Sequence, residues 1–276
     1  MLNLMYITNK PAVAQIAESA GVNRIFVDME YIGKADRQGG MDTVQSHHTL
    51  TDVKAIRQAI TKAELMVRVN PIHEATTEYT SSEEEINGAI ENGADVVMLP
   101  FFKTVEEVAY FIKVVNGRAK VMPLLETPEA VDVIDDILAL DGLDQIFIGI
   151  NDLSLGYGKK FMFELLADGT VEKLCYKFKQ AGKPYGFGGI AALGKGALPA
   201  EKVIAEHYRL GSTYAILSRS FCNTNKVTHM GEISNTFVNG LRDIREYEKT
   251  VAAHSDFFSH NQEEVRKAVE QICTTK

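Results

Sequence analysis

The feature that most constrains the fold is the alternation of short apolar runs with longer amphipathic segments along most of the chain. We expect the apolar runs to be buried strands, at residues 2–8, 24–28, 65–68, 96–99, 121–125, 146–149, 185–188 and 214–217. Helix signals lie between them, such as Pro11 at a first turn and Ser81 three residues before Glu84. Eight β/α repeats in 276 residues predict an α/β fold, a closed (β/α)8 TIM barrel, rather than an open sheet.

The end of the chain falls outside this eightfold pattern. Two further helices are expected near residues 233–253 and 261–272. We therefore predict a barrel catalytic domain over residues 1–225. Additional C-terminal helices over residues 226–276 would form an extension that packs on the barrel or on a neighbouring subunit.

Composition excludes several classes of function. Acidic side chains outnumber basic ones and the net charge is −8, which argues against binding to nucleic acid or to an anionic membrane. Cys175, Cys222 and Cys273 have neither the spacing of a disulfide framework nor that of a zinc site. The sequence has no membrane-spanning apolar stretch and no signal-peptide pattern at its start. We expect a cytoplasmic protein with a small-molecule substrate.

Two carboxylates follow consecutive expected strands. Glu126 comes directly after residues 121–125, and Asp152 lies just beyond residues 146–149. The carboxyl ends of parallel strands meet at one rim, so these side chains can converge on Mg²⁺ or Mn²⁺, leaving roughly four of six positions for substrate oxygens and water. A helix N-cap or a lysine pair is the alternative for either acid alone. Because the two acids occur on consecutive strands, we favour the metal site.

A second group of charges lies on the neighbouring strands. Arg68 ends an apolar run, where burial of a guanidinium is costly unless it meets an anion. It would hold a substrate carboxylate or stabilise an enolate oxygen, or form a salt bridge to an acid nearby. Asp28 and Glu30 share one side of their strand and are candidates to orient Arg68 or metal-bound water from the outer shell. A structural salt bridge is the equal alternative.

The long segment over residues 30–50 contains the candidate bases. His47 and His48 titrate near neutral pH and suit general acid–base catalysis, although a solvated loop pair is the commoner case. Gly149 is expected to let the backbone approach a ligand beside Asp152. Leu99 and Pro100 are counted with the substrate-binding residues.

The order of these motifs resembles the HpcH/HpaI aldolase and citrate lyase β-subunit family. The resemblance covers roughly residues 12–220 and rests on five segments, of which the last two are the most specific: Val27-Asp28-Met29-Glu30, Val67-Arg68-Val69-Asn70, Gly93 to Pro100, Leu125-Glu126-Thr127 and Phe147 to Ser154. It implies a metal-dependent (β/α)8 barrel. Glu126 and Asp152 would be the metal ligands, Arg68 would contact the keto oxygen and the enolate, and amides near Asn151 would receive the pyruvyl carboxylate. The family is oligomeric, which implies a homo-oligomer here.

The resemblance implies a carbon–carbon lyase of the class II aldolase type, which cleaves or forms 4-hydroxy-2-oxo acids through a pyruvate enolate. Its partners would be a 2-oxo acid and an aldehyde. The family's aldolases carry Asp-x-Glu-His after the second strand, whereas this chain has Tyr31 at the histidine position. His47, His48, Tyr31 and a metal-bound water are the candidate replacements. A lyase acting on a CoA thioester and a non-catalytic ligand-binding barrel are the alternatives.

Overall fold

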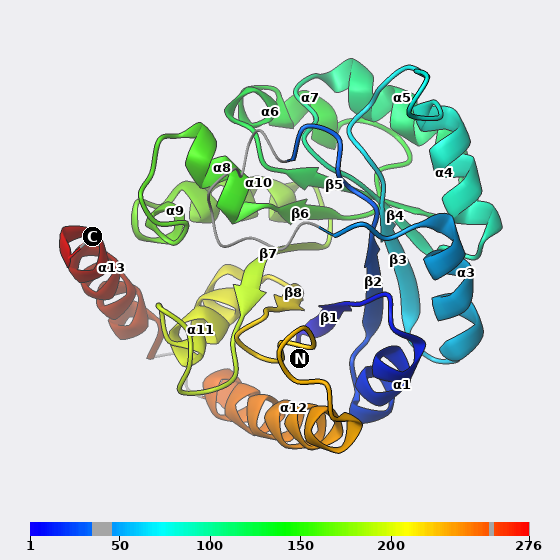
Figure 1. Ribbon diagram of the computed structural model, residues 1–276. Helices are drawn as coiled ribbons and strands as arrows, with labels where there is room; N and C mark the ends of the chain where they lie inside the picture. The colour runs from blue at the N-terminus through cyan, green and yellow to red at the C-terminus, as the bar shows by residue number, and fades with distance from the viewer. Residues whose placement is uncertain (35–45, 254–256, 276) are drawn as a thin grey trace.

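The computed structural model describes residues 1–34, 46–253 and 257–275. Eight parallel strands close into a barrel in chain order, and β8 is hydrogen-bonded to β1 (Figure 1). The strands are β1 (Asn3–Ile7), β2 (Arg24–Asp28), β3 (Glu64–Arg68), β4 (Val96–Leu99), β5 (Lys120–Leu125), β6 (Ile146–Ile148), β7 (Tyr185–Ile190) and β8 (Tyr214–Leu217). The predicted TIM barrel is confirmed.

Helices connect successive strands and form the outer ring of the barrel (Figure 1). They are α1 (Pro11–Ala20), α3 (Leu50–Ala59), α4 (Ser82–Glu91), α5 (Val105–Val115), α6 (Pro128–Asp132), α7 (Ile134–Leu138), α8 (Ile150–Gly156), α9 (Glu164–Ala167), α10 (Thr170–Gln180) and α11 (Ala200–Leu210). The capping box that the sequence indicates at Ser81 is present, with its hydroxyl accepting the Glu84 N–H. Local sequence therefore fixes where this helix begins.

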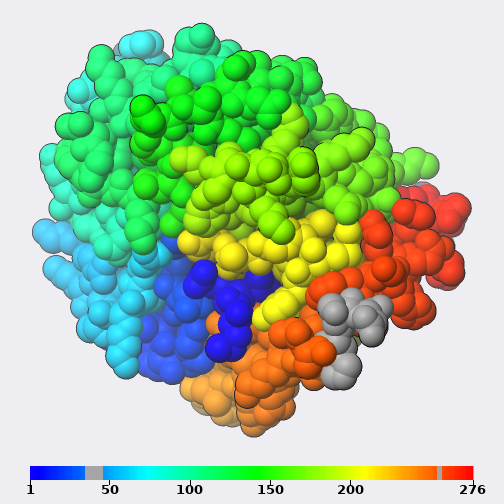
Figure 2. All heavy atoms as spheres, turned by 180° about the vertical axis from the view of Figure 1, so that it is seen from behind, coloured from blue at the N-terminus to red at the C-terminus, as the bar shows by residue number. Residues whose placement is uncertain are grey.

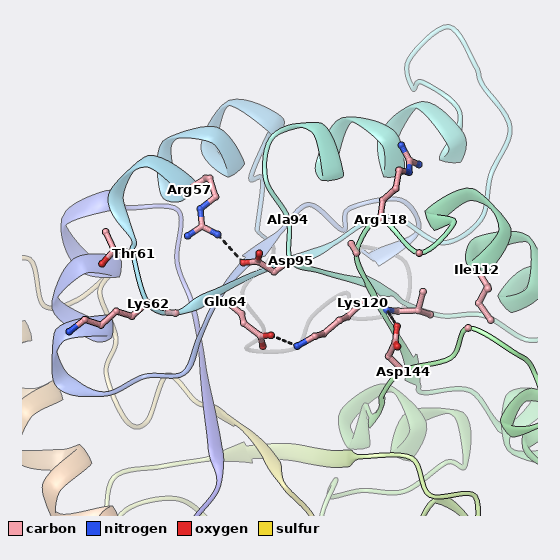
Figure 3. A pocket seen from close by; sticks show the side chains of 15 residues that line it. Arg57, Thr61, Lys62, Glu64, Ala94, Asp95, Ile112, Arg118, Lys120 and Asp144 are labelled. Carbon is pink, nitrogen blue, oxygen red and sulfur yellow. Dashed lines mark hydrogen bonds and ion pairs between the residues drawn. The ribbon is translucent and has the colours of Figure 1, made fainter.

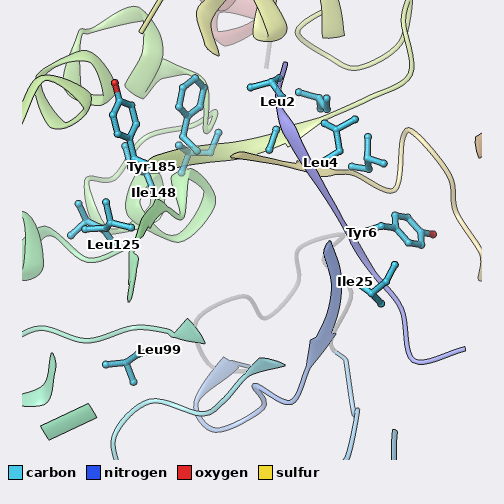
Figure 4. Close-up of a cluster of buried hydrophobic side chains, with 14 of the residues drawn as sticks. Leu2, Leu4, Tyr6, Ile25, Leu99, Leu125, Ile148 and Tyr185 are labelled. Atoms are coloured by element: carbon cyan, nitrogen blue, oxygen red, sulfur yellow. The ribbon is translucent and has the colours of Figure 1, made fainter. Parts of the chain in front are cut away.

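Strand side chains alternate between two separate apolar layers. Those that point inward, such as Phe26, Met98 and Phe147, fill the barrel interior. Those that point outward pack under the helices, as Leu4, Leu99 and other labelled side chains do in Figure 4. The period of two explains the division, because neighbouring residues of a strand face opposite sides of the sheet.

Arg24 closes the interior at the N-terminal end of the strands. Its side chain is buried, and its guanidinium lies 2.6 Å from a Glu64 oxygen and 3.1 Å from the Gln145 amide oxygen. It also lies against the sulfur atoms of Met5 and Met66, at 3.8 and 3.9 Å. Arg24 and its hydrogen-bonded partners therefore close the N-terminal end of the barrel, and the C-terminal end is left open for a site.

Two helices follow the last strand, α12 (Met230–Ala253) and α13 (Phe257–Thr275). Helix α12 packs against α1 and α11, and α13 packs against α9 and α11. The buried Glu248 of α12 accepts the Leu2 N–H, and Figure 2 shows the first residues beside this helix. The division into domains at residue 225 stays a prediction. Among the described residues, no helix has the length and apolarity that crossing a membrane requires.

Candidate active site at the barrel mouth

The C-terminal ends of the strands, called the barrel mouth below, carry a buried cluster of charges. Asp28 and Arg68 are register partners on β2 and β3. The guanidinium Nε and Nη2 of Arg68 donate to the two carboxylate oxygens of Asp28, each at 2.8 Å. Lys34 places its ammonium 3.1 Å from Asp28 and 3.2 Å from Glu30, while Glu30 also lies 3.3 Å from Arg68 Nε. Two cations thus hold two buried carboxylates.

Asp28 and Arg68 remain ionised at neutral pH. Burial alone would raise the pKa of Asp28, but the charges and hydrogen bonds of Arg68 and Lys34 hold it well below its usual value of 3.8. Burial opposes the charge of Arg68 as well, and Asp28 and Glu30 outweigh that effect and raise its pKa. The bidentate pair therefore fixes the Arg68 guanidinium in one orientation at the mouth.

Glu126 is held by an unusual turn after β4. Its Oε1 atom accepts the Phe101 N–H at 2.9 Å, and Phe101 has a left-handed φ of 48°. Such a conformation costs a non-glycine residue about 1–2 kcal/mol, so the turn orients that N–H at the expense of local stability. On the other side, a Cβ atom at Gly149 would lie 2.6 Å from Glu126 Oε2. Glycine is required here to leave room for the carboxylate.

Glu126 and Asp152 form an acidic pair in which the ionised form of Glu126 is disfavoured. Both are buried at the mouth. Burial raises the pKa of Glu126 well above its usual value, and the negative charges of Glu30 and Asp152 raise it further, although Arg68 opposes them. Among the described residues no group of three or more histidine, cysteine or acidic side chains comes together as a metal site. Two oxygen donors in this electrostatic setting fit a hard divalent cation that takes its other ligands from substrate and water.

Two adjoining cavities open at the mouth. The first, which we call the reaction cavity, measures about 220 Å³ and is lined by Arg68, Glu126, Asp152 and Asn151, with Gly149 in its wall. The second, of about 330 Å³, is lined by Asp28, Lys34, His48 and Arg68, among others. Arg68 borders both cavities. The structure thus brings the predicted metal ligands and the predicted enolate-stabilising residue to one place.

The two candidate histidines lie in different environments. His48 borders the second cavity, and its Nδ1 atom accepts the Asp28 N–H at 3.0 Å. Burial lowers its pKa despite the opposing charge of Asp28. A neutral His48 in this geometry carries its proton on Nε2 and is a hydrogen-bond donor there. His47 is exposed and is not among the lining residues of either cavity.

Tyr31, which replaces the family histidine, points away from the mouth. Its side chain is 39% exposed and its ring lies 5.4 Å from that of Tyr79. Its N–H donates to Asn70 Oδ1. It is not among the residues that line either cavity, so His48 is the better placed replacement.

Of the other predicted substrate-binding residues, Leu99 and Pro100 lie apart from the reaction cavity. Leu99 is outward-facing and belongs to the layer under the helices, whereas Met98 of the same strand lines the cavity. Pro100 is buried and is not among the lining residues of either cavity. Sequence reasoning missed Lys34, although its position four residues after Glu30 offered a signal, because that spacing permits an ion pair across one helical turn.

A larger cavity of about 660 Å³ lies at the N-terminal end of the strands (Figure 3). Four of its charged side chains form two ion pairs: Arg57 lies 2.8 Å from Asp95, and Lys120 lies 2.5 Å from Glu64. Asp144 accepts the Val121 N–H. These contacts stabilise the closed end of the barrel, the end that in such folds serves stability rather than catalysis.

Fold and site together define an α/β barrel with an acidic pocket at the C-terminal mouth, the place where barrel enzymes carry their active sites. A family model described as HpcH/HpaI aldolase/citrate lyase matches residues 3–187. The chain belongs to this family, as its motifs indicate, and family membership makes it a lyase of the aldolase and citrate lyase kind.

Relatives agree with this assignment. The chain is 24% identical over 213 residues to the 4-hydroxy-4-methyl-2-oxoglutarate aldolase cghB of Chaetomium globosum, a match that covers 65% of this chain and 72% of that protein. A family member from Burkholderia cenocepacia has a similar fold, with a TM-score of 0.62 and 17% identity over 84% of this chain and 94% of that one. The citrate synthase SbnG has a TM-score of 0.59 and 16% identity over 88% and 92%. At these identities the two structures show the shared fold alone.

Proposed function

We propose that this protein is a divalent-metal-dependent carbon–carbon lyase that cleaves or forms a 4-hydroxy-2-oxo acid, with pyruvate as one product. The observation that carries the proposal is the meeting of Arg68, Glu126 and Asp152 in the reaction cavity. The relative from Chaetomium globosum is named for a reaction on a substrate of this class, which supports the same choice. The small volume of the cavity, about 220 Å³, suits a pyruvyl group.

Glu126 and Asp152 would hold Mg²⁺ or Mn²⁺, which when bound supplies Lewis-acid polarisation of the substrate keto group. The backbone N–H groups in the first turn of α8, at Asn151 and Asp152, point out of the helix N-terminus and would receive the substrate carboxylate. Arg68 would then face the keto oxygen. Its fixed guanidinium would stabilise the negative charge that develops there as the C3–C4 bond breaks.

His48 would bind the oxygen on C4. With Nδ1 accepting the Asp28 N–H, the Nε2–H of the neutral ring is free to donate to a substrate oxygen in the adjoining cavity. This bond would hold the alkoxide that forms when the 4-hydroxyl passes its proton to a water molecule in the cavity, which then carries that proton away. To accept that proton itself, the ring would first have to break its bond to the Asp28 N–H, so we assign His48 a positioning and charge-stabilising role.

The partners and setting of this enzyme stay predictions. We expect a 2-oxo acid and an aldehyde as ligands, a homo-oligomeric assembly and a cytoplasmic location.

Replacement of Arg68 distinguishes a catalytic role of this side chain from a purely structural one. Its replacement by alanine should spare metal binding but abolish turnover, because the side chain contacts the enolate rather than the metal.

The test is a coupled assay of pyruvate release from a panel of 4-hydroxy-2-oxo acids, with added Mg²⁺ or Mn²⁺ and then with chelator. We expect release that chelator abolishes. Glu126→Gln and Asp152→Asn should each remove it, whereas Glu129→Gln should not, because Glu129 is an exposed acid paired with Lys103 in the neighbouring turn. Near-normal activity in either ligand variant, or no release with any substrate, would refute the proposal.

A further inference from the structure

Asn70 follows β3 and connects three parts of the molecule, although no step of the proposed reaction uses it. Its side chain is buried, and both of its polar atoms are engaged. The Oδ1 atom accepts the N–H groups of Tyr31 and Ile32, each at 2.9 Å. The Nδ2 atom donates to Glu85 Oε1 at 2.8 Å and to the Met29 carbonyl oxygen at 3.3 Å. Asn70 therefore joins the end of β3 to the segment that follows β2 and to helix α4.

Glu85 of α4 holds the Asn70 amide in one orientation. Its two carboxylate oxygens accept the Nδ2–H and the backbone N–H of Asn70, at 2.8 and 3.1 Å. A carboxylate offers acceptors only, so Nδ2 of the amide must face it and Oδ1 must face the other way. Glu85→Gln would present a donor to one of these N–H groups, and the amide would lose its fixed orientation.

Glu85 is buried without a cation as its partner. Its side chain forms no ion pair with a lysine or arginine in the part of the chain that the structure describes. Burial raises its pKa, although the bonds to Asn70 and the charge of the nearby His73 oppose the increase. A buried carboxylate costs stability that an apolar side chain would not. The contact with Asn70 is therefore what this carboxylate supplies.

His73 closes the connection between β3 and α4. Its two ring nitrogens lie 2.7 Å from the Pro71 carbonyl oxygen and 2.8 Å from the Thr80 carbonyl oxygen, at opposite ends of the connection. The His73 N–H donates to the hydroxyl of Ser82, the first residue of α4. These contacts hold the first turn of α4, which carries Glu85, beside the end of β3.

The segment that Asn70 anchors brings Lys34 to the mouth. Tyr31 begins a turn that ends at Lys34, whose N–H donates to the Tyr31 carbonyl at 3.2 Å. The buried Lys34 ammonium lies 3.1 and 3.2 Å from the two carboxylates that also bind Arg68. Because the N–H groups at the start of the turn are bound by Asn70, the orientation of its amide determines where the lysine lies.

We propose that Glu85 and Asn70 are a positioning pair for the lyase reaction, which anchors the turn over residues 31–34 and so keeps Lys34 beside the acids that fix Arg68. This inference rests on the proposed function for its catalytic consequence. It deepens that function by assigning part of the charge balance at the mouth to a helix of the outer ring. Without the pair, Lys34 moves away, the two acids lose one of their two cations, and Arg68 is drawn further toward them.

Labelling of lysines with acetic anhydride, followed by mass spectrometry, tests the anchor without turnover. Lys34 is 4% exposed and should react slowly in the folded wild type. Glu85→Gln should raise its labelling rate about tenfold, while labelling of the exposed Lys54 stays unchanged. The matched control is Glu83→Gln, which removes the same charge from an exposed position of α4 and should leave Lys34 slow. Equal labelling of Lys34 in the wild type and Glu85→Gln would overturn the proposal.

A polarity swap keeps the proposal testable where a single variant does not fold. In Asn70→Asp/Glu85→Gln, the new glutamine donates to one aspartate oxygen and accepts the N–H of residue 70. The other aspartate oxygen still accepts the two N–H groups of the turn. Lys34 should therefore stay within about threefold of its wild-type labelling rate in the double variant. Labelling of the double variant as fast as that of Glu85→Gln would also overturn the proposal.

The same proteins decide the catalytic consequence. At saturating metal, kcat for pyruvate release should fall about tenfold in Glu85→Gln with KM nearly unchanged, because the metal ligands and the first turn of α8 are untouched. The polarity swap should restore most of the lost kcat, and Glu83→Gln should match the wild type. Faster labelling of Lys34 with an unchanged kcat would overturn the positioning role. If the wild type itself releases no pyruvate, the proposed function fails, and the labelling still decides whether the pair holds Lys34.

Discussion

Gly149→Ala is the substitution that most directly tests how the site is built. The register of β5 and β6 places Leu125 beside Ile148, and the next residue pair brings Gly149 against Glu126. An added Cβ would lie 2.6 Å from Glu126 Oε2 and 2.8 Å from Glu126 Cβ. An ordinary contact is about 3.4 Å, so the carboxylate must move by about 0.8 Å. Its bond to the Phe101 N–H opposes that movement.

The expected effects are a modest loss of stability and a large loss of activity. Overpacking of this kind costs about 1–3 kcal/mol. A misplacement of about 1 Å in a catalytic constellation costs about 100-fold in rate. The backbone at Gly149 adopts a φ of −80°, which alanine tolerates, so any loss comes from the steric contact with Glu126 rather than from backbone strain.

Thermal unfolding and metal-dependent pyruvate release measure the two effects on the same protein. Gly88→Ala is the matched control, because its Cβ would meet a Leu50 methyl at 2.7 Å, the flexible end of a side chain far from the mouth. That change should be neutral or stabilise by up to about 1 kcal/mol through helix propensity. Activity of Gly149→Ala within twofold of the wild type would refute the idea that glycine is required at this position to leave room for the Glu126 carboxylate.

Three further predictions concern the charged residues. Asp28→Asn leaves Arg68 with a weakened partner in a buried site and should lower the free energy of unfolding in urea by about 3–5 kcal/mol at pH 7. Because the folded pKa of Asp28 lies below its usual 3.8, this difference from the wild type should persist above about pH 4 and shrink as the pH falls further. A constant difference down to about pH 2 would contradict the prediction. His48→Gln keeps a hydrogen-bond donor, so its rate of pyruvate release should stay within about tenfold of the wild type, whereas His48→Ala should lose about 100-fold. Equal, large losses in both variants would instead identify the imidazole as the base. Arg24→Met should lower the free energy of unfolding by only about 1–3 kcal/mol, because Glu64 keeps its pair with Lys120, and kcat should be unchanged. A fall in kcat would show that the N-terminal end of the barrel affects the mouth.

The fold could be predicted from the sequence because each of its signals is local. Strands with buried faces must be apolar, and their alternation with capped amphipathic helices leaves few architectures open. Part of the site follows from the same rule. Asp28 and Arg68 are even-numbered residues of β2 and β3, and Glu126 directly follows β5. The inward residues of these strands, Phe26, Met66 and Met122 among them, are also even-numbered. Strand parity therefore predicts that all three side chains point into the mouth.

The same parity, applied strictly, assigns Leu99 to the outer layer, as the structure does. What no local pattern supplies is the contact between distant segments. The bond from the Asp28 N–H to His48 spans twenty residues, part of which lies outside the described ranges. The left-handed turn at Phe101, which orients Glu126, depends on the packing of the mouth rather than on residue type, because phenylalanine carries no preference for a positive φ.

The charges at the mouth explain why two acidic pairs so close together have different roles. Asp28 and Glu30 are matched by Arg68 and Lys34, and this half of the site is electrostatically complete in the folded protein. Glu126 is different: its raised pKa records that burial and two nearby acids outweigh the help of Arg68. A further positive charge beside Glu126 would offset this effect. A divalent cation meets the same need and also leaves coordination positions for a substrate, which a side-chain cation cannot do. The neutral half therefore orients Arg68, and the acidic half is suited to bind the metal.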